Sequence, residues 1–353
     1  MRPSRVLSWG LALGLCASLG LVTTGPARAD KFAGAFLEAG AGARALGLGG
    51  AYTAIADDAS GIYWNPAGLA STSRHEVLLS HEFRFGDLVD YSFLGGIYQV
   101  RQRNGRFGLG VIRLGIDSIA FTDSTMWNDL NGNGQIDGWV DLNNNGQVDG
   151  NETEFVYDPN KLHYVNDAEW AVFLSYAQPV SSWQFGGNLK FITQSVGDFS
   201  SFGIGLDVGV LKHDVLHRLD LGLAVHDLTG TYLSWSTGRK ETIVPVPTLG
   251  LAYRLDSNAL RGSFLFAGDM AVHFDDRRNA DQFWAGPTSV NLNWGLEFNM
   301  QNRLALRFGL QEESFQAGAG FAAGPVRFDY GVIPDPKSEF DASQRLSLRW
   351  VGP

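Results

Sequence analysis

The sequence predicts an all-β fold: an antiparallel transmembrane β-barrel of about 14 strands with an N-terminal plug inside the lumen. Three observations support this prediction. The chain begins with an export signal, its apolar residues alternate with polar residues from His75 onward, and its short and long connections alternate too. These features assign residues 1–29 to the signal peptide, 30–72 to the plug and 73–353 to the barrel.

The first 29 residues have the three parts of a secretory signal. Arg2 and Arg5 form a basic region, Val6–Val22 is apolar, and residues 27–29 form an A-x-A cleavage site before Asp30. We therefore expect a protein that is exported and then cleaved. Export with a barrel pattern predicts the outer membrane of a Gram-negative cell as the location.

Cys16 offers a competing interpretation of this region, a lipoprotein anchor. Leu15 disfavours it, because a small residue is expected before an anchoring cysteine. Cys16 is the only cysteine, so the mature chain has no disulfide. Removing Arg2, Arg5 and Arg28 with the signal changes the formal net charge from −10 to −13. An acidic exported protein has no electrostatic basis for binding nucleic acid.

Period-two alternation is the main evidence for strands. In residues 288–300, for example, Val290, Leu292, Trp294 and Leu296 alternate with Asn, Gly and Glu residues. Each apolar face is about 10 residues long, which is enough for a tilted strand to cross the hydrocarbon layer. A soluble β-sandwich is disfavoured, because the opposite face carries Gly, Asn, Asp, Arg, Lys and Glu, and these are poor core residues.

The connections provide an independent test of the strand count. The candidate strands are residues 75–85, 89–101, 106–119, 167–178, 182–194, 201–212, 217–227, 247–256, 262–274, 288–300, 302–311, 314–323, 325–334 and 343–352. Every long connection (120–166, 228–246, 275–287 and 335–342) follows an odd-numbered strand. Outer-membrane barrels have short periplasmic turns and long external loops, so this parity favours the proposed strand order.

Residues 30–72 lack a membrane-spanning pattern and are rich in small residues, which let backbones pack closely. A barrel of this size is too wide for its own side chains to fill, so we expect this segment to occupy the lumen. Three charged residues, Arg44, Asp57 and Asp58, would then be buried and need partners. Candidate partners from the barrel are Lys190, Arg254, Arg307 and Arg327. A structural role for these charges is favoured over ligand binding.

The segment Gly42–Ala70 also carries the turn sequence Tyr-Trp-Asn-Pro-Ala-Gly, in which Asn65, Pro66 and Ala67 form the central triplet. Pro fixes φ and Asn tolerates tight turns, so a turn that seats the plug is favoured over direct ligand contact. Gly42–Ala70 closely resembles the N-terminal signature of the PorV/PorQ family. These bacterial outer-membrane proteins are related to the FadL-type transporters of long-chain fatty acids, and the Asn-Pro-Ala triplet is shared with that wider group.

The resemblance implies a monomeric FadL-type channel for hydrophobic small molecules, surrounded by outer-membrane lipid. The ligand would enter from outside, meet the plug, and leave by a plug rearrangement or a lateral opening. The alternative is a PorV-like scaffold or shuttle that works with proteins of a secretion system. An apolar pocket near the external end of the barrel would favour transport, and an exposed apolar loop face would favour a scaffold.

An insertion at residues 123–158 contains a 12-residue pattern written twice, and it matches calcium-binding loops of the form D-x-[DN]-x-[DN]-G-x₅-E. Candidate ligands are Asp129, Asn131, Asn133, Gln135 and Asp137 in the first copy, and Asp141, Asn143, Asn145, Gln147, Asp149 and Glu152 in the second. In the second copy Glu152 supplies the bidentate carboxylate and Gly146 the sharp turn. The first copy has Val140 at the corresponding last position, so its calcium assignment is weaker. A polar hairpin without metal is the alternative for both copies.

Catalysis has little support in the sequence. The seven histidines are scattered, and neither H-E-x-x-H nor G-x-S-x-G occurs. His213 and His217 fall in a predicted turn. We therefore expect a protein that is not an enzyme, with calcium as its one expected cofactor.

Overall fold

A computed structural model describes residues 34–100, 104–121, 145–147, 162–277, 280–334 and 342–352. The signal peptide and most of the 123–158 insertion lie outside these residues. Within them, no helix is long and apolar enough to cross a membrane. The statements that follow concern the described residues.

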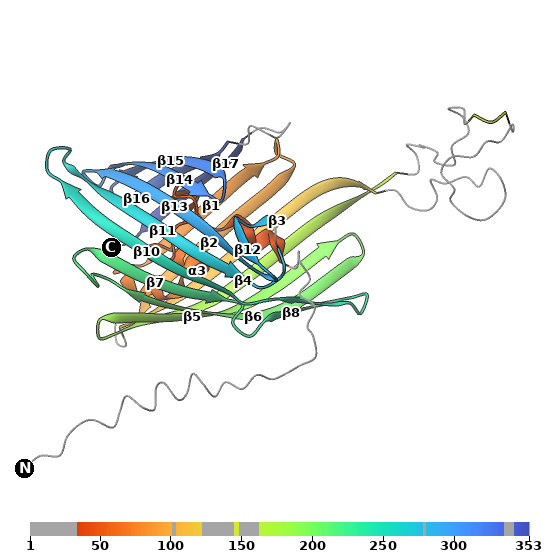
Figure 1. The fold of residues 1–353 in the computed structure, drawn as a ribbon, viewed down its shortest axis with the longest axis horizontal. Coiled ribbons are helices and arrows are strands. Elements are labelled where there is room, and N and C mark those ends of the chain that lie inside the picture. Colours follow the sequence, from red (N-terminus) through yellow and green to blue (C-terminus); the bar gives the residue numbers. More distant parts are fainter. Residues whose placement is uncertain are drawn as a thin grey trace, which may run out of the picture.

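Fourteen strands pair antiparallel, each with the next, and the last pairs with the first to close a barrel (Figure 1). They are β1 (Glu76–Arg84), β2 (Val89–Val100), β3 (Gly105–Phe121), β4 (His163–Val180), β5 (Trp183–Val196), β6 (Phe199–Lys212), β7 (Leu219–His226), β10 (Val246–Ser257), β11 (Gly262–His273), β13 (Thr288–Met300), β14 (Leu304–Gln311), β15 (Ser314–Ala323), β16 (Val326–Ile333) and β17 (Ser343–Val351). Closure leaves no unpaired edge, which is what a strand structure in lipid requires. The predicted antiparallel barrel and its strand count are confirmed.

Three further strands were not predicted. β8 (Thr231–Trp235) pairs with β6 and with β9 (Lys240–Ile243), so the two extend the wall beyond β7 and β10. β12 (Phe283–Ala285) folds back on β13. All three lie in long connections, and they are too short to show a clear period of two.

The two ends of the barrel differ in their connections. The connections that follow β2, β4, β6, β10, β13 and β15 are all short and lie at one end, which we call the short-turn end. Gln301 and Asn302, for example, both have positive φ, as a tight hairpin turn requires. The four longest connections follow β3, β7, β11 and β16 at the opposite end, the long-loop end. The predicted parity is confirmed.

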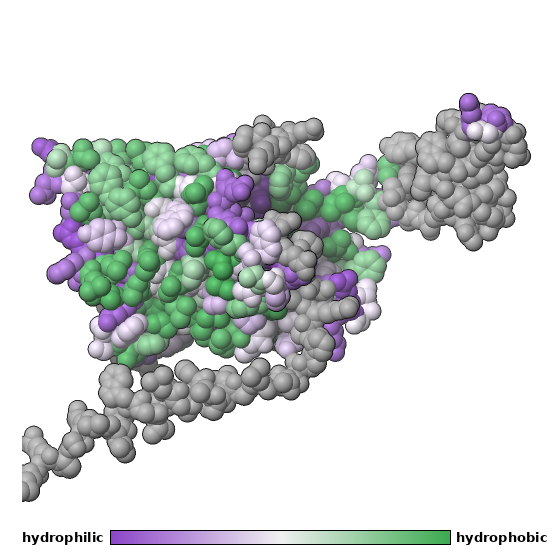
Figure 2. Space-filling view, viewed as in Figure 1, coloured by the Kyte–Doolittle hydropathy of each residue, from purple (hydrophilic) through white to green (hydrophobic). Residues whose placement is uncertain are grey.

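The strands present apolar side chains outward and polar side chains inward. On β14, Leu306 and Phe308 are 53% and 50% exposed, whereas Arg307 between them is 1% exposed. Hydrophobic residues cover much of the wall visible in Figure 2, with hydrophilic residues gathered toward its ends. This reverses the pattern of a water-soluble barrel and suits a wall that faces lipid.

Residues 34–72, the N-terminal segment, lie inside this wall and form four short helices (Figure 1). These are η1 (Ala35–Ala39), α2 (Ala43–Gly47), α3 (Gly61–Trp64) and η2 (Pro66–Ser71). Toward strands β1–β5 the segment packs through apolar side chains such as Ile62 and Leu69, which contact inward residues such as Phe93 and Ile112. A second apolar cluster joins residues such as Leu48 and Ile55 of the segment to Ala252, Leu265 and Ala267 of β10 and β11.

Inward-facing glycines make room for the segment. The glycine seat consists of Gly186, Gly209, Gly222, Gly250, Gly295 and Gly309, which stand on six strands. A Cβ atom at any of these six would lie 2.0–2.7 Å from an atom of the N-terminal segment. Real Cβ atoms essentially never come so close to a non-bonded atom. Glycine therefore allows the backbone of the segment to contact the backbone of the wall.

Candidate functional site

A buried ion cluster fixes the middle of the N-terminal segment. The Arg44 guanidinium lies 2.9 Å from Glu297 and 2.5 Å from Asp57, and it donates to the Tyr52 hydroxyl at 3.0 Å. Glu297 also accepts a hydrogen bond from Arg307 at 2.6 Å. Two buried guanidinium groups thus share one carboxylate of the wall, so that each buried charge has a partner.

The two aspartates of the segment have different surroundings. Burial opposes the ionisation of Asp57, but the charges of Arg44 and Arg349 and the hydrogen bond from Arg44 together outweigh it, so the pKa of Asp57 lies below its ordinary value. Asp58 lies 3.5 Å from Arg349 of β17 and accepts hydrogen bonds from Ser60 and Tyr52. Both aspartates therefore have structural partners.

The wall residues that pair with these charges differ from the expected ones. Lys190 pairs instead with Asp207 and Asp227, and Arg254 pairs with Asp220. The observed partners are Glu297 and Arg349. Period two identifies which face a residue occupies, but not its height in the lumen or its neighbour across it, so the sequence could not select these pairs.

Asn65, Pro66 and Ala67 form the predicted turn. The Asn65 side-chain oxygen accepts from Ala67 N at 3.1 Å and so caps η2, while its amide donates to Thr53 O at 2.8 Å. The turn packs against Gly186 and Gly209 of the glycine seat. The triplet therefore holds the N-terminal segment against the wall.

Several anchors of the segment were not found from the sequence. Asp269 of β11 accepts from the backbone N–H groups of Tyr52 and Thr53, both at 2.9 Å. Glu76 accepts from Ala59 N at 2.7 Å, and Arg345 donates to Ala39 O at 2.7 Å. The alternating pattern places these two acids and the arginine on the inward face. Their partners could not be predicted, because these are main-chain groups, which every residue has.

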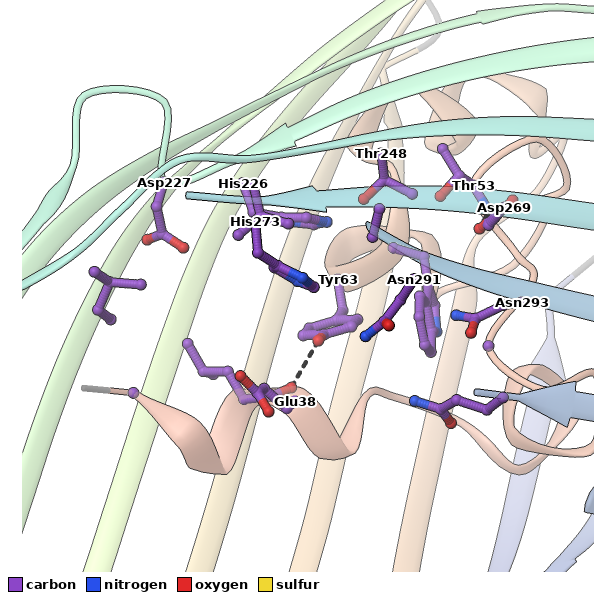
Figure 3. Close-up of a pocket in the computed structure, with 18 of the residues that line it drawn as sticks. Glu38, Thr53, Tyr63, His226, Asp227, Thr248, Asp269, His273, Asn291 and Asn293 are labelled. Carbon is purple, nitrogen blue, oxygen red and sulfur yellow. Dashed lines mark hydrogen bonds between the residues drawn. The ribbon is translucent and has the colours of Figure 1, made fainter. Parts of the chain in front are cut away.

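The segment leaves a cavity toward the long-loop end, with a volume of about 190 Å³, which we call the long-loop cavity (Figure 3). Tyr63, Trp64 and Phe173 supply aromatic surface, and Leu37, Ile243, Val246 and Ala271 supply aliphatic surface. Neutral polar groups come from His226, His273, Thr248, Asn291, Asn293 and Gln311, and charged groups from Glu38, Lys190, Asp227, Asp269, Arg277 and Glu312. The Tyr63 ring stacks on the His226 ring with a centroid distance of 5.8 Å.

Polar contacts hold the rim of this cavity. Asp281 accepts hydrogen bonds from Ser289 and Asn291, and it lies 2.8 Å from His273 Nδ1. Arg277, in the connection after β11, forms a 2.7 Å ion pair with Glu38 of the N-terminal segment. The loop and the segment are therefore joined directly at the long-loop end.

A second cavity of about 290 Å³ lies on the other side of the segment, toward the short-turn end. It is lined mainly by charged and amide side chains, including Arg44, Asp57, Glu297, Arg327 and Arg349. The segment thus separates a cavity with aromatic and polar walls from one that has mainly charged and amide walls.

The structure also brings together Ser71, His213 and Asp220, a set that the sequence did not reveal. Ser71 Oγ lies 2.9 Å from His213 Nε2, and His213 Nδ1 lies 3.1 Å from Asp220. However, His213 Nδ1 is not aligned for a hydrogen bond, Ser71 donates to Gln184, and Asp220 is paired with Arg254. Neither cavity is lined by Ser71. The three residues tie the end of η2 to the short turn after β6.

The expected calcium ligands are almost all outside the described residues. Those outside are Asp129, Asn131, Asn133, Gln135, Asp137, Asp141, Asn143, Asp149 and Glu152. Of the described ones, Asn145 accepts from Gln147 N at 2.7 Å, and Gly146 between them has φ of 82°. In the described part of the chain, no cluster of three or more His, Cys, Asp or Glu residues could hold a metal ion. Calcium binding stays a prediction.

The sequence model of an uncharacterised protein family (UPF0164) matches residues 22–148, and no curated protein sequence matches the chain. Two deletion mutants of TodX, a monoaromatic hydrocarbon channel, have similar structures, with TM-scores of 0.54 and 0.52. Each is 11% identical to this chain, and the alignment covers 88% of this chain and 97% of the channel. At this identity the likeness shows the fold: this chain is a barrel similar to TodX.

Proposed function

We propose that the protein is an outer-membrane channel of FadL type for hydrophobic small molecules. One observation carries this proposal: the lumen of a closed barrel is occupied by an N-terminal segment that leaves an aromatic-walled cavity next to the long-loop end. The structurally similar TodX variants are described as monoaromatic hydrocarbon channels, which supports the same class of ligand. The export signal and the apolar outer wall support the outer membrane as the location.

In this proposal residues 34–72 are the plug. The glycine seat and the Arg44–Glu297 pair hold the plug against many strands. Moving it as a whole would separate buried charges from their partners, which is costly. We therefore favour a lateral exit over displacement of the plug.

The wall offers a place for such an exit. β6 pairs with β7 as far as Val225 and with β8 from Tyr232, and between these two residues the regular ladder is interrupted. His226 and Asp227, at this interruption, both line the long-loop cavity. A ligand in the cavity would therefore lie close to this interruption of the ladder.

A scaffold for secreted proteins, of the PorV type, is the second candidate. The observation in its favour is the short strand β12, where Phe283 and Trp284 are 59% and 53% exposed in a connection at the long-loop end. Such a surface suits contact with another protein. The position of the aromatic cavity at the same end favours transport.

Uptake by cells tests the proposal. A deletion strain should lose uptake of radiolabelled toluene, and the wild-type gene should restore it. Ala271→Trp should not restore uptake, because Ala271 lines the cavity and an indole would fill much of it. Val272→Trp, one residue along β11 and on the opposite face of the strand, is the matched control and should restore uptake. Normal uptake in the deletion strain, with exported proteins trapped in the periplasm, would overturn the channel in favour of the scaffold.

A further inference from the structure

Among the side chains that line the long-loop cavity, His226 and Asn293 have polar atoms without a hydrogen-bond partner in the described part of the chain. His226 lines the cavity, and its ring nitrogens form no hydrogen bond with any residue that the structure describes. Two neighbouring polar groups are engaged: the Tyr63 hydroxyl donates to Leu37 O at 2.6 Å, and His273 Nδ1 contacts Asp281. Figure 3 shows His226 directed toward Tyr63 and the central space. A neutral imidazole offers one donor and one acceptor, and here both are available to a ligand.

The size and walls of the cavity restrict what can lie beside His226. Its volume of about 190 Å³ slightly exceeds the roughly 150 Å³ of an engineered protein cavity that binds benzene. Tyr63, Trp64 and Phe173 provide flat surfaces against which a ring can pack edge-to-face or offset. An extended alkyl chain would exceed this volume, whereas a single ring with a small substituent fits it.

We propose that the long-loop cavity selects single-ring aromatic molecules that carry a hydroxyl group, with the ring against Tyr63 and the hydroxyl bonded to His226. This inference rests on the proposed channel function and names its ligand class more closely. A phenolic hydroxyl can donate to the unprotonated ring nitrogen or accept from the protonated one, so it can form one hydrogen bond with either tautomer of the imidazole. A hydrocarbon of the same shape fills the cavity but leaves the imidazole unpaired, so it binds less tightly.

The test compares two ligands that differ by one hydroxyl, p-cresol and toluene, bound to the purified full-length protein in detergent. Titration calorimetry gives both dissociation constants. We expect p-cresol to bind about 3- to 10-fold more tightly, the effect of one neutral hydrogen bond. In His226→Phe the two constants should become equal while that of toluene is unchanged. His226→Gln, which keeps a donor and an acceptor, should retain part of the preference.

His163→Phe is the control variant, because His163 is exposed at the long-loop end of β4 and does not line the cavity. It should bind both ligands as the wild type does. Equal constants for p-cresol and toluene in the wild type would overturn the hydroxyl preference and leave the channel proposal intact. Binding of neither ligand would count against both proposals. A folded His226→Phe protein that keeps the full preference would show that another group binds the hydroxyl.

Discussion

Gly186→Ala should loosen the N-terminal segment by adding one carbon atom. Gly186 faces the lumen from β5, and a Cβ atom there would lie 2.3 Å from Pro66 C and 2.4 Å from Ala67 N. An ordinary contact begins at 3.4 Å, so the Pro66–Ala67 backbone would have to withdraw by about 1.1 Å. That backbone also rests on Gly209 and is held by the Asn65 cap, so it cannot withdraw freely.

We expect Gly186→Ala to lower the free energy of unfolding, because the added methyl group overpacks a rigid site. Inserting a methyl group into a well-packed interior typically destabilises a protein by about 1–3 kcal/mol. Gly187→Ala is the matched control, since Gly187 is the next residue and faces outward. Its Cβ would have a single neighbour within 4 Å, Asp207 O at 3.3 Å. We expect the control to change stability by less than about 0.5 kcal/mol.

Guanidinium unfolding of the two variants in lipid vesicles, followed by tryptophan fluorescence, gives the two changes in free energy. Limited proteolysis provides a second measurement, because a loosened segment should be cut faster in Gly186→Ala than in Gly187→Ala. Equal stability and equal cleavage of the two variants would refute the close contact between segment and wall.

Three further predictions concern orientation, calcium and acid. A cysteine at Ser236 should react with an impermeant maleimide on intact cells and one at Asn104 should not; the reverse result would invert the barrel. Calcium should protect residues 129–154 from proteolysis with a dissociation constant on the order of 10⁻⁴–10⁻³ M, and Glu152→Gln should abolish the protection of the second repeat. The same digestion pattern with calcium and with EDTA would mean that the repeat is a polar hairpin without metal. Because folding lowers the pKa of Asp57, its ionised carboxylate stabilises the fold above pH ~4, and this stabilisation is lost as the pH falls further. In urea unfolding, Asp57→Asn should therefore lose less stability between pH 7 and pH 3 than the wild type does.

The wall was predictable because lipid imposes a simple rule on it. Each strand must place apolar residues on alternate positions over its full length, so the pattern of β13 alone locates that strand. The alternation of short and long connections then checks the count. β8, β9 and β12 escaped prediction, because they lie in connections and no such rule governs their sequence.

The lumen was predictable only in kind. The burial of Arg44 and Asp58 was foreseen, but their partners Glu297 and Arg349 lie on distant strands, at heights set by the strand register. The glycines were a signal that could have been used. Glycines such as Gly250 and Gly309 recur on the polar face of the strands. Repeated glycine on one face of a strand indicates that another backbone approaches it closely.

The cavity could not be derived from the sequence. His226 lies near the end of the predicted strand 217–227, and nothing in its local pattern shows that Tyr63 of a distant segment would stack on it. A cavity is defined by what several segments leave empty, and that depends on the full packing rather than on any one motif. The Asn65 triplet, in contrast, was recognised because a turn is local.

Closure of the lumen by the N-terminal segment is tested most directly by conductance in planar bilayers. The intact protein should show no steady ion current, because the segment contacts the wall on many strands. A variant that lacks Ala39–Ala70 should fold and conduct as an open pore, because the remaining 14-stranded barrel cannot fill its own interior. Equal conductance of the intact protein and a folded deletion variant would contradict this account.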